Sequence, residues 1–166
     1  NIKLNTINDD NDTLLTININ KSKTKNDDYN KNILSLIKNK VDLNSPLKNL
    51  PLNIAITENK YYIVESLVKA GANIDIKDDN YTTPLIMAIN NNMGDVVDLL
   101  VKNKANLDYN GPEGDENLMT RAILNNDMKT INMLIDSGYN IKHVNRFLET
   151  PLHVLLEKGN TYSLDL

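Results

Sequence analysis

The stretch Thr83-Pro84-Leu85-Ile86-Met87-Ala88-Ile89 decides the fold, because it recurs along the chain at a nearly constant interval. Equivalent stretches begin at Leu50, Asn117 and Thr150, so successive copies are 33, 34 and 33 residues apart. A fixed period of this length indicates stacked copies of one small structural unit.

Each copy of this stretch has the features of a short helix with one apolar side. Pro84 stands where a helix begins, and proline is tolerated in the first turn. Leu85, Ala88 and Ile89 follow at the i, i+3, i+4 spacing that places side chains on one helical face. The stretch therefore predicts a one-sided helix of about two turns.

A second stretch follows each of the first three copies at a constant distance, over residues 63–75, 96–108 and 130–142. It carries apolar residues at helical spacing again, and in two copies it ends at Gly71 or Gly138. Glycine suits the left-handed position that ends many helices. The pattern predicts a second helix in each unit.

A polar segment such as Lys77 to Thr82 separates each second helix from the next Thr-Pro-Leu, and it predicts an exposed hairpin-like loop. This order of loop, Thr-Pro-Leu helix and second helix resembles the ankyrin repeat, whose unit is about 33 residues and opens with Thr-Pro-Leu-His. The resemblance covers nearly the whole chain. It implies an all-α ankyrin-repeat solenoid of helix-turn-helix units with projecting loops.

The resemblance predicts one ankyrin-repeat domain over residues 1–166. Its first full repeat is degenerate, with helices expected over 13–19 and 32–40 and an insertion over 21–28. Neither end shows the polar cap of a complete array, so we expect the chain to be cut from a longer one. The expected parts are a tail of a preceding repeat (1–4), repeat 1 (5–44), repeat 2 (45–77), repeat 3 (78–110), repeat 4 (111–143) and a partial repeat 5 (144–166).

The composition limits the classes of partner. Only 5% of residues are aromatic, with Phe147 the one phenylalanine, so the core is expected to consist of Leu, Ile, Val, Met and Ala. A net charge of −4 and an isoelectric point near 5.1 give no basic footprint for nucleic acid. No apolar run approaches the length of a membrane span. We expect a monomer that neither binds nucleic acid nor inserts into a membrane.

The absence of cysteine leaves the cellular compartment open. A cytoplasmic location is the first expectation, with secretion or delivery into a host as alternatives. Asn, Ile, Lys and Asp are abundant, as AT-rich codons would supply. A prion-like polar tract is the alternative, but the asparagines alternate with regular apolar positions.

The two histidines do not predict a catalytic site. In the ankyrin family a histidine at the place of His153 bonds locally at the start of its helix, so the resemblance gives His153 a structural role. His143 has no acidic or cysteine neighbour at ligand spacing and is expected on the surface. Paired aspartates in exposed loops would both stay ionised, whereas acid–base catalysis needs separated pKa values. We therefore expect no enzyme, no cofactor and no metal.

Two other motifs have stronger ordinary explanations. Residues 8–12 are acidic, but the glycine and glutamate that a calcium loop needs are missing at positions six and twelve. Residues 111–114 lack the lysine and hydroxyl residue of a phosphate-binding loop and predict an enlarged turn. Of the tyrosine pair, Tyr61 is expected in the core, and Tyr62 is expected to point outward as an ordinary surface residue or a binding anchor.

The resemblance implies a protein-protein interaction scaffold that holds its partner on the concave surface of loops and first helices. The alternative is a targeting or regulatory arm of a larger enzyme or effector, whose catalytic domain lies outside these residues. The variable contact positions of the family are the loop tips and the ends of the first helices. They correspond here to Lys77, Asp79, Asn80, Thr82, Asn90, Asn91, Thr57, Glu58, Asp115, Glu116, Leu124, Asn125, Arg146 and Phe147, with Lys48, Asn49, Glu149, Glu157 and Lys158 beside them.

Two of these positions, Leu124 and Phe147, are apolar. They are candidates for the few anchors that dominate interface energy, or they pack loops inside the stack. Aspartates outnumber lysines around repeat 3. An acidic to neutral groove predicts a protein partner with a basic or amide-rich surface.

Overall fold

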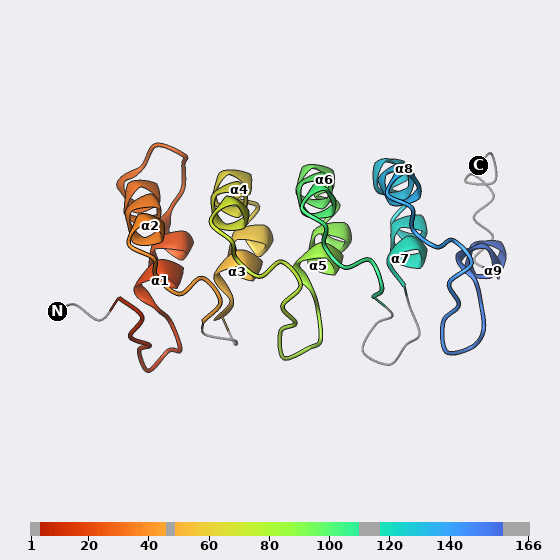
Figure 1. Cartoon of the computed structure of the whole chain (residues 1–166), viewed down its shortest axis with the longest axis horizontal. Helices are drawn as coiled ribbons and strands as arrows, with labels where there is room; N and C mark the ends of the chain where they lie inside the picture. The colour runs from red at the N-terminus through yellow and green to blue at the C-terminus, as the bar shows by residue number, and fades with distance from the viewer. Residues whose placement is uncertain (1–3, 46–48, 110–116, 158–166) are drawn as a thin grey trace. The chain divides into compact units, whose positions relative to one another are not determined.

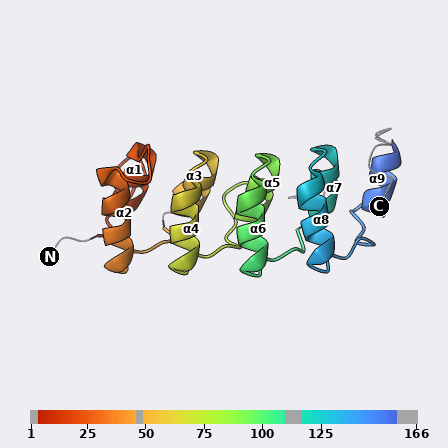
Figure 2. The same cartoon turned by 90° about the horizontal axis from the view of Figure 1, so that it is seen from above.

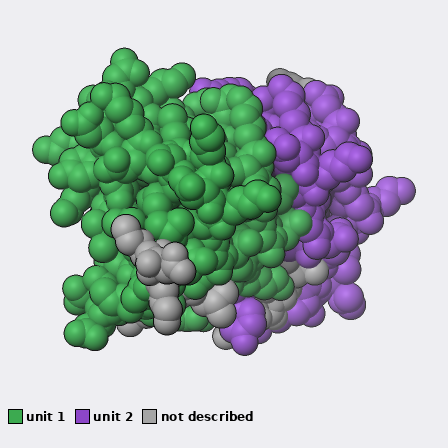
Figure 3. All heavy atoms as spheres, turned by 60° about the vertical axis from the view of Figure 1, so that its left-hand side comes forward, with its two compact units in different colours: residues 1–79 green, residues 80–166 purple. Residues whose placement is uncertain are grey.

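The computed structural model describes residues 4–45, 49–109 and 117–157, and over these residues it contains nine helices and no strand (Figure 1). The all-α fold expected from the sequence is confirmed. The chain divides into two compact units, residues 1–79 and 80–166, which Figure 3 shows in different colours. The positions of the repeat boundaries stay a prediction.

The first unit contains two helical hairpins. α1 (Leu14–Lys21) packs against α2 (Asp28–Lys38), and α3 (Pro51–Thr57) packs against α4 (Tyr61–Lys69). α1 also contacts α3, and α2 contacts α4, so the two hairpins are stacked side by side. Fully buried side chains such as Leu15, Ile19, Ile33, Ile63 and Leu67 fill the space between them.

The second unit repeats this arrangement. α5 (Pro84–Asn90) pairs with α6 (Gly94–Lys102), and α7 (Leu118–Leu124) pairs with α8 (Met128–Asp136). α9 (Pro151–Glu157) packs on α7. Figure 2 shows the first helices of successive pairs in one row and the second helices in another within this unit. The core is aliphatic, as the composition predicts.

Side-chain caps explain where the first helices begin. Thr13 forms a reciprocal capping box with Thr16, and the Thr83 hydroxyl accepts the amide N–H of Ile86 at 3.4 Å. Asn117 stands where the other copies have Thr or Leu, and its Oδ1 accepts the Thr120 N–H at 2.9 Å. Asparagine is as good a cap as threonine, so the departure from Thr-Pro leaves the helix start intact.

Left-handed residues explain where the helices end. Gly71 and Gly138 have φ of +88° and +78°, as the sequence predicted, but the equivalent positions after α2 and α6 hold Lys40 and Lys104 at +57° and +65°. The amide after each of the four donates to a carbonyl inside the helix, which closes the last turn. The first helices α3, α5 and α7 end on left-handed Asn59, Asn92 and Asn126.

Two expectations for the first unit are wrong. α2 begins at Asp28 instead of residue 32 and ends at Lys38, because the Asp27 carboxylate caps it through the Asn30 N–H. The connection before it is shorter than expected, residues 22–27. Tyr61 is 40% exposed and not in the core. It is the first residue of α4, and such a side chain covers the surface before the helix, beyond the packed face.

Candidate partner-binding surface

The loops that precede the first helices share one conformation at their tips. Asn11, Tyr81 and Leu148 stand two residues before the capping threonine of their helices, and their φ values are 64°, 59° and 61°. Residues other than glycine rarely adopt this left-handed backbone conformation, and for bulky residues it is a clear outlier. The tips are therefore one repeated structural feature, with different side chains displayed on it.

The loop before α9 is held by a single asparagine. The Asn145 side-chain oxygen accepts the N–H groups of Phe147 at 2.9 Å and Glu149 at 3.0 Å. Its amide nitrogen donates to Glu149 Oε2 at 2.8 Å, and its backbone N–H donates to the Glu149 carbonyl at 3.0 Å. These four bonds close a compact turn on one buried residue, so the side chains at its tip are displayed in a fixed orientation.

That turn exposes two large apolar side chains. Phe147 is 61% exposed and Leu148 is 78% exposed. The Arg146 guanidinium lies 4.7 Å from the centre of the Phe147 ring, within the range of a cation–π contact. Phe147 therefore does not pack inside the stack, which was the alternative left open by the sequence.

The other sequence-predicted loop residues lie in both units and are mostly exposed. In residues 1–79, Lys77 and Asp79 are exposed. In residues 80–166, Asn80 is exposed and Thr82 is half-buried, and Tyr81 between them is 63% exposed. Tyr81 was not among the sequence-predicted residues. The signal for it is its position, since the tip holds a left-handed residue and a bulky side chain is rare in that conformation.

The predicted positions at the ends of the first helices differ in their surroundings. Thr57, Glu58, Asn90 and Asn91 are exposed, and Leu124 is 40% exposed. Asn125 is half-buried, and its amide nitrogen donates to the Ile89 carbonyl of α5 at 2.8 Å. One N–H of this side-chain amide is thus engaged within the unit.

Some of the predicted positions lie outside the described residues, namely Asp115 and Glu116, together with Lys48 and Lys158. Asn49 and Glu149 are described, and both make hydrogen bonds inside their own unit. Asn49 donates to the Asn11 carbonyl at 3.2 Å, and Glu149 binds Asn145.

The charges of the chain are distributed unequally between the units. Residues 1–79 contain 11 lysines and 11 acidic residues and are neutral overall. Residues 80–166 contain 7 basic and 11 acidic residues, so the whole net charge of −4 comes from this unit. The unit that carries the exposed Tyr81, Phe147 and Leu148 is therefore the acidic one by sequence.

The residues weighed for other chemistry have local partners. His153 Nδ1 lies 3.1 Å from the Thr150 amide and 2.8 Å from its hydroxyl, so the imidazole holds the start of α9 as the resemblance implied. His143 is half-buried, and its backbone N–H bonds the Asn140 carbonyl. Tyr62 is half-buried, with its hydroxyl 3.1 Å from Ser22 Oγ.

Over residues 4–45, 49–109 and 117–157, no group of three or more His, Asp or Glu side chains gathers as a metal site would require. None of the helices in this described part combines the length and the apolar character that a bilayer crossing demands.

Comparison with known proteins agrees with the geometry. The family model for ankyrin repeats, which spans three copies, matches residues 23–113 and again residues 52–145. The chain therefore belongs to the ankyrin repeat family. No curated protein matches it. Ankyrin repeats are in general modules for protein-protein interaction and are typically not catalytic.

Proposed function

We propose that the chain binds a partner protein through the loops that precede its first helices and through the ends of those helices. The observation that carries this proposal is the turn over residues 144–150. A buried asparagine fixes its backbone, yet its tip exposes Phe147 and Leu148. A rigid display of apolar side chains lowers the entropy that binding would otherwise cost.

Strain supports the same assignment. Tyr81 and Leu148 occupy a left-handed conformation that costs bulky residues on the order of 1 kcal/mol or more, and each is more than 60% exposed. Neither side chain gains burial in return. A partner that covers these tips would supply that gain, and large aromatic or aliphatic side chains are the usual anchors of an interface.

The charge of the second unit indicates the chemistry of the partner. Because residues 80–166 have a net charge of −4, the partner is expected to bring a basic or amide-rich surface around a pocket for the apolar tip residues. The Arg146 guanidinium over Phe147 adds one local positive group beside the tip. Charge in this surface would change association rate and salt sensitivity more than affinity.

A differential capture experiment tests the proposal. The chain, its Tyr81→Ala/Phe147→Ala variant and its Asp98→Ala/Lys102→Ala variant are used as baits in extracts of the source cell, with quantification by mass spectrometry. Asp98 and Lys102 form an ion pair 2.7 Å long on the outer side of α6 and serve as the matched control. A partner should be retained by the chain and the control, and lost with the tip variant.

A further variant in the same experiment tests the role of charge. Asp79, Asn80 and Asn91, which are all exposed, are changed together to arginine. This variant should weaken the same complex and leave the melting temperature nearly unchanged, because exposed substitutions usually shift stability by about 0.5 kcal/mol or less. Loss of the complex in the Asp98/Lys102 variant alone would place the partner on the second helices and contradict the proposal. The same surface would serve a regulatory arm of a larger enzyme or effector, which the full-length gene distinguishes.

A further inference from the structure

The connection between α1 and α2 is longer than the fold requires. The turns inside the other three described hairpins contain three residues, 58–60, 91–93 and 125–127, whereas this one contains six, 22–27. It projects beyond α2 on the side away from the loop that precedes α1 (Figure 1). Within the first unit it is therefore a different surface from the loop that precedes α1. The segment Lys21 to Asp27 is called the lysine loop below.

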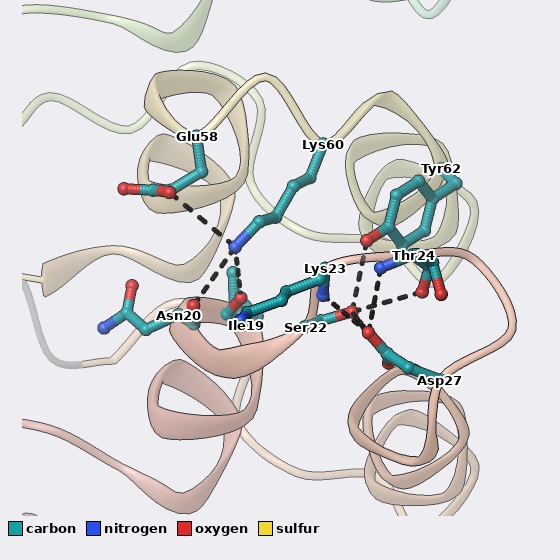
Figure 4. A network of polar contacts seen from close by, with 9 residues as sticks. All are labelled: Ile19, Asn20, Ser22, Lys23, Thr24, Asp27, Glu58, Lys60 and Tyr62. Carbon is teal, nitrogen blue, oxygen red and sulfur yellow. Dashed lines mark hydrogen bonds and ion pairs between the residues drawn. The ribbon is translucent and has the colours of Figure 1, made fainter.

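The lysine loop is ordered around one carboxylate (Figure 4). Asp27 accepts the backbone N–H groups of Lys23 at 2.5 Å and Thr24 at 2.9 Å, and the Asn30 N–H at 2.7 Å. The Ser22 hydroxyl donates to the same carboxylate at 3.0 Å. Asn30 also donates from its side chain to the Lys25 carbonyl. The loop backbone is thus held at three successive residues, Lys23, Thr24 and Lys25, and the Ser22 side chain anchors the loop beside them.

A bond to the next hairpin fixes the loop on the unit. Ser22 Oγ lies 3.1 Å from the Tyr62 hydroxyl of α4, and Ser22 is buried. Because the one proton of Ser22 goes to Asp27, Tyr62 donates in this pair. Serine at position 22 thus faces inward, whereas the lysines at 21, 23 and 25 are exposed.

The carboxylates near the lysine loop already have partners. The Asp27 carboxylate accepts hydrogen bonds from the backbone. The Asp28 carboxylate lies 2.9 Å from Lys31 Nζ, and the Glu65 carboxylate lies 2.8 Å from Lys69 Nζ. Lys25 adds to the positive field that lowers the pKa of Glu65, after the hydrogen bond and charge of Lys69. Within the described residues no carboxylate lies at ion-pair distance from the ammonium groups of Lys21, Lys23 or Lys25. Three positive charges are therefore displayed on a fixed loop.

We propose that the lysine loop is a second docking site, which binds an acidic segment of a partner protein. Lys21, Lys23 and Lys25 are all exposed within five residues, at the last residue of α1 and in the turn that follows it. A short peptide rich in carboxylates offers opposite charges to all three ammonium groups at once. A preformed loop loses little entropy on binding, so three weak pairs can act together.

Charge distribution favours an acidic peptide over nucleic acid. Residues 1–79 are neutral overall and the chain has a net charge of −4, so beyond the three lysines a phosphate backbone would meet repulsion. Nucleic-acid sites need several phosphate contacts along an extended basic track. A short acidic segment needs only the lysine loop.

The probe is a fluorescein-labelled peptide with glutamate at alternate positions, followed by fluorescence anisotropy at low and at physiological ionic strength. Lys21→Gln/Lys23→Gln/Lys25→Gln should weaken its binding about tenfold, which is what three exposed ion pairs contribute together. The matched control, Lys102→Gln/Lys104→Gln/Lys142→Gln, removes the same charge from exposed positions in the second unit and should change binding less than about twofold. Equal loss in both variants, or no saturable binding by the parent chain, would overturn the proposal.

Two further arms separate the alternatives. Asp27→Asn removes one negative charge but weakens the loop's hydrogen bonds, so the proposal expects weaker peptide binding, and tighter binding would show that charge alone attracts the peptide. An unlabelled oligonucleotide of equal charge should displace the peptide less well than unlabelled peptide does. Better displacement by the oligonucleotide would overturn the acidic-peptide assignment. None of these variants alters the loop tips, so failure here leaves the proposed function standing.

Discussion

Two turns of the molecule each donate a side-chain hydrogen bond to the end of a first helix in the preceding hairpin, but they do so with different side chains. In the first unit, Lys60 of the α3–α4 turn reaches the end of α1 and donates to the Ile19 carbonyl at 2.7 Å and the Asn20 carbonyl at 3.3 Å (Figure 4). In the second unit, Asn125 of the α7–α8 turn donates to the Ile89 carbonyl at the end of α5 at 2.8 Å. Ile19 and Ile89 are equivalent positions of their repeats.

The difference lies in charge and burial. Lys60 is buried and carries Glu58 at 3.7 Å as a counter-charge, whereas Asn125 is neutral and half-buried. A cation also interacts favourably with the negative end of the helix dipole of α1. The last carbonyls of a helix have no partner inside the helix, so a stack of hairpins needs a donor there from the next hairpin. This donor comes from a different position in each of the two turns.

The largest expected effect is a loss of stability on replacing a buried alanine beside each turn. It tests whether the two alanines occupy equivalent positions of their repeats. Ala55 and Ala122 are fully buried, and their carbonyls accept the N–H groups of Lys60 at 2.8 Å and Asp127 at 3.0 Å. Ala55→Glu and Ala122→Glu would each bury an unpaired charge, so each should lower the free energy of unfolding by about 3–5 kcal/mol. Urea denaturation measures this. A melting temperature within a few degrees of the parent in either variant would show that the packing positions are misassigned.

The next prediction concerns the two donors themselves. Lys60→Met keeps the length of the side chain and matches Met93 at the equivalent position of the α5–α6 turn. It should cost about 1.5–3 kcal/mol, the range for hydrogen bonds to charged groups, whereas Asn125→Ala should cost about 0.5–1.5 kcal/mol. Unfolding free energies from urea titrations give both values. If the asparagine variant proved the more costly of the two, burial and charge would not be what distinguishes these turns.

A smaller contrast exists at the ends of the second helices, where each unit has one glycine and one lysine in the left-handed conformation. Lys40 and Lys104 should each gain about 0.5–1 kcal/mol on replacement by glycine, because a side chain in this conformation is strained. Gly71→Ala and Gly138→Ala should lose a similar amount, although an added Cβ would meet no atom within 4 Å at either position. Thermal melts of the four variants check the signs. Opposite signs in the lysine variants would mean that the lysine stems stabilise these ends.

The sequence predicted the repeated parts of the fold because they depend on local rules. Thr83, Pro84 and Gly71 specify helix starts and ends through their own backbone preferences, and the apolar spacing specifies the buried faces. It did not predict the Lys60 and Asn125 bonds, since a long side chain at an irregular position gives no periodic signal.

The same limit explains the errors in the first unit. Asp27 looked like part of a polar insertion, and only its place relative to Ser22, Thr24 and Asn30 makes it the cap of α2. Tyr61 followed the apolar pattern of its helix but lies beyond the packed face. For the candidate surface, sequence positions identified Phe147, whereas its exposure and its fixed loop required the structure.

The smallest contrast at neutral pH involves the lysine loop, since the two described hairpins of the second unit have three-residue turns in its place. Desolvation raises the pKa of Asp27, but hydrogen bonds from the Thr24, Asn30 and Lys23 backbone and the Ser22 hydroxyl outweigh it and lower the pKa to about 2, from an ordinary value of 3.8. A lowered folded-state pKa contributes stability that is fully present above the unfolded value and is lost as pH falls through the folded one. The difference in unfolding free energy between the parent chain and Asp27→Asn should therefore be constant above pH 5 and shrink between about pH 4 and 2.

Urea titrations at several pH values measure this difference. Asp127→Asn in the second unit is the matched control, since Asp127 accepts the Thr130 N–H at 3.1 Å as the cap of α8. A difference for Asp27→Asn that stayed flat down to pH 2 would mean that its carboxylate does not hold the lysine loop.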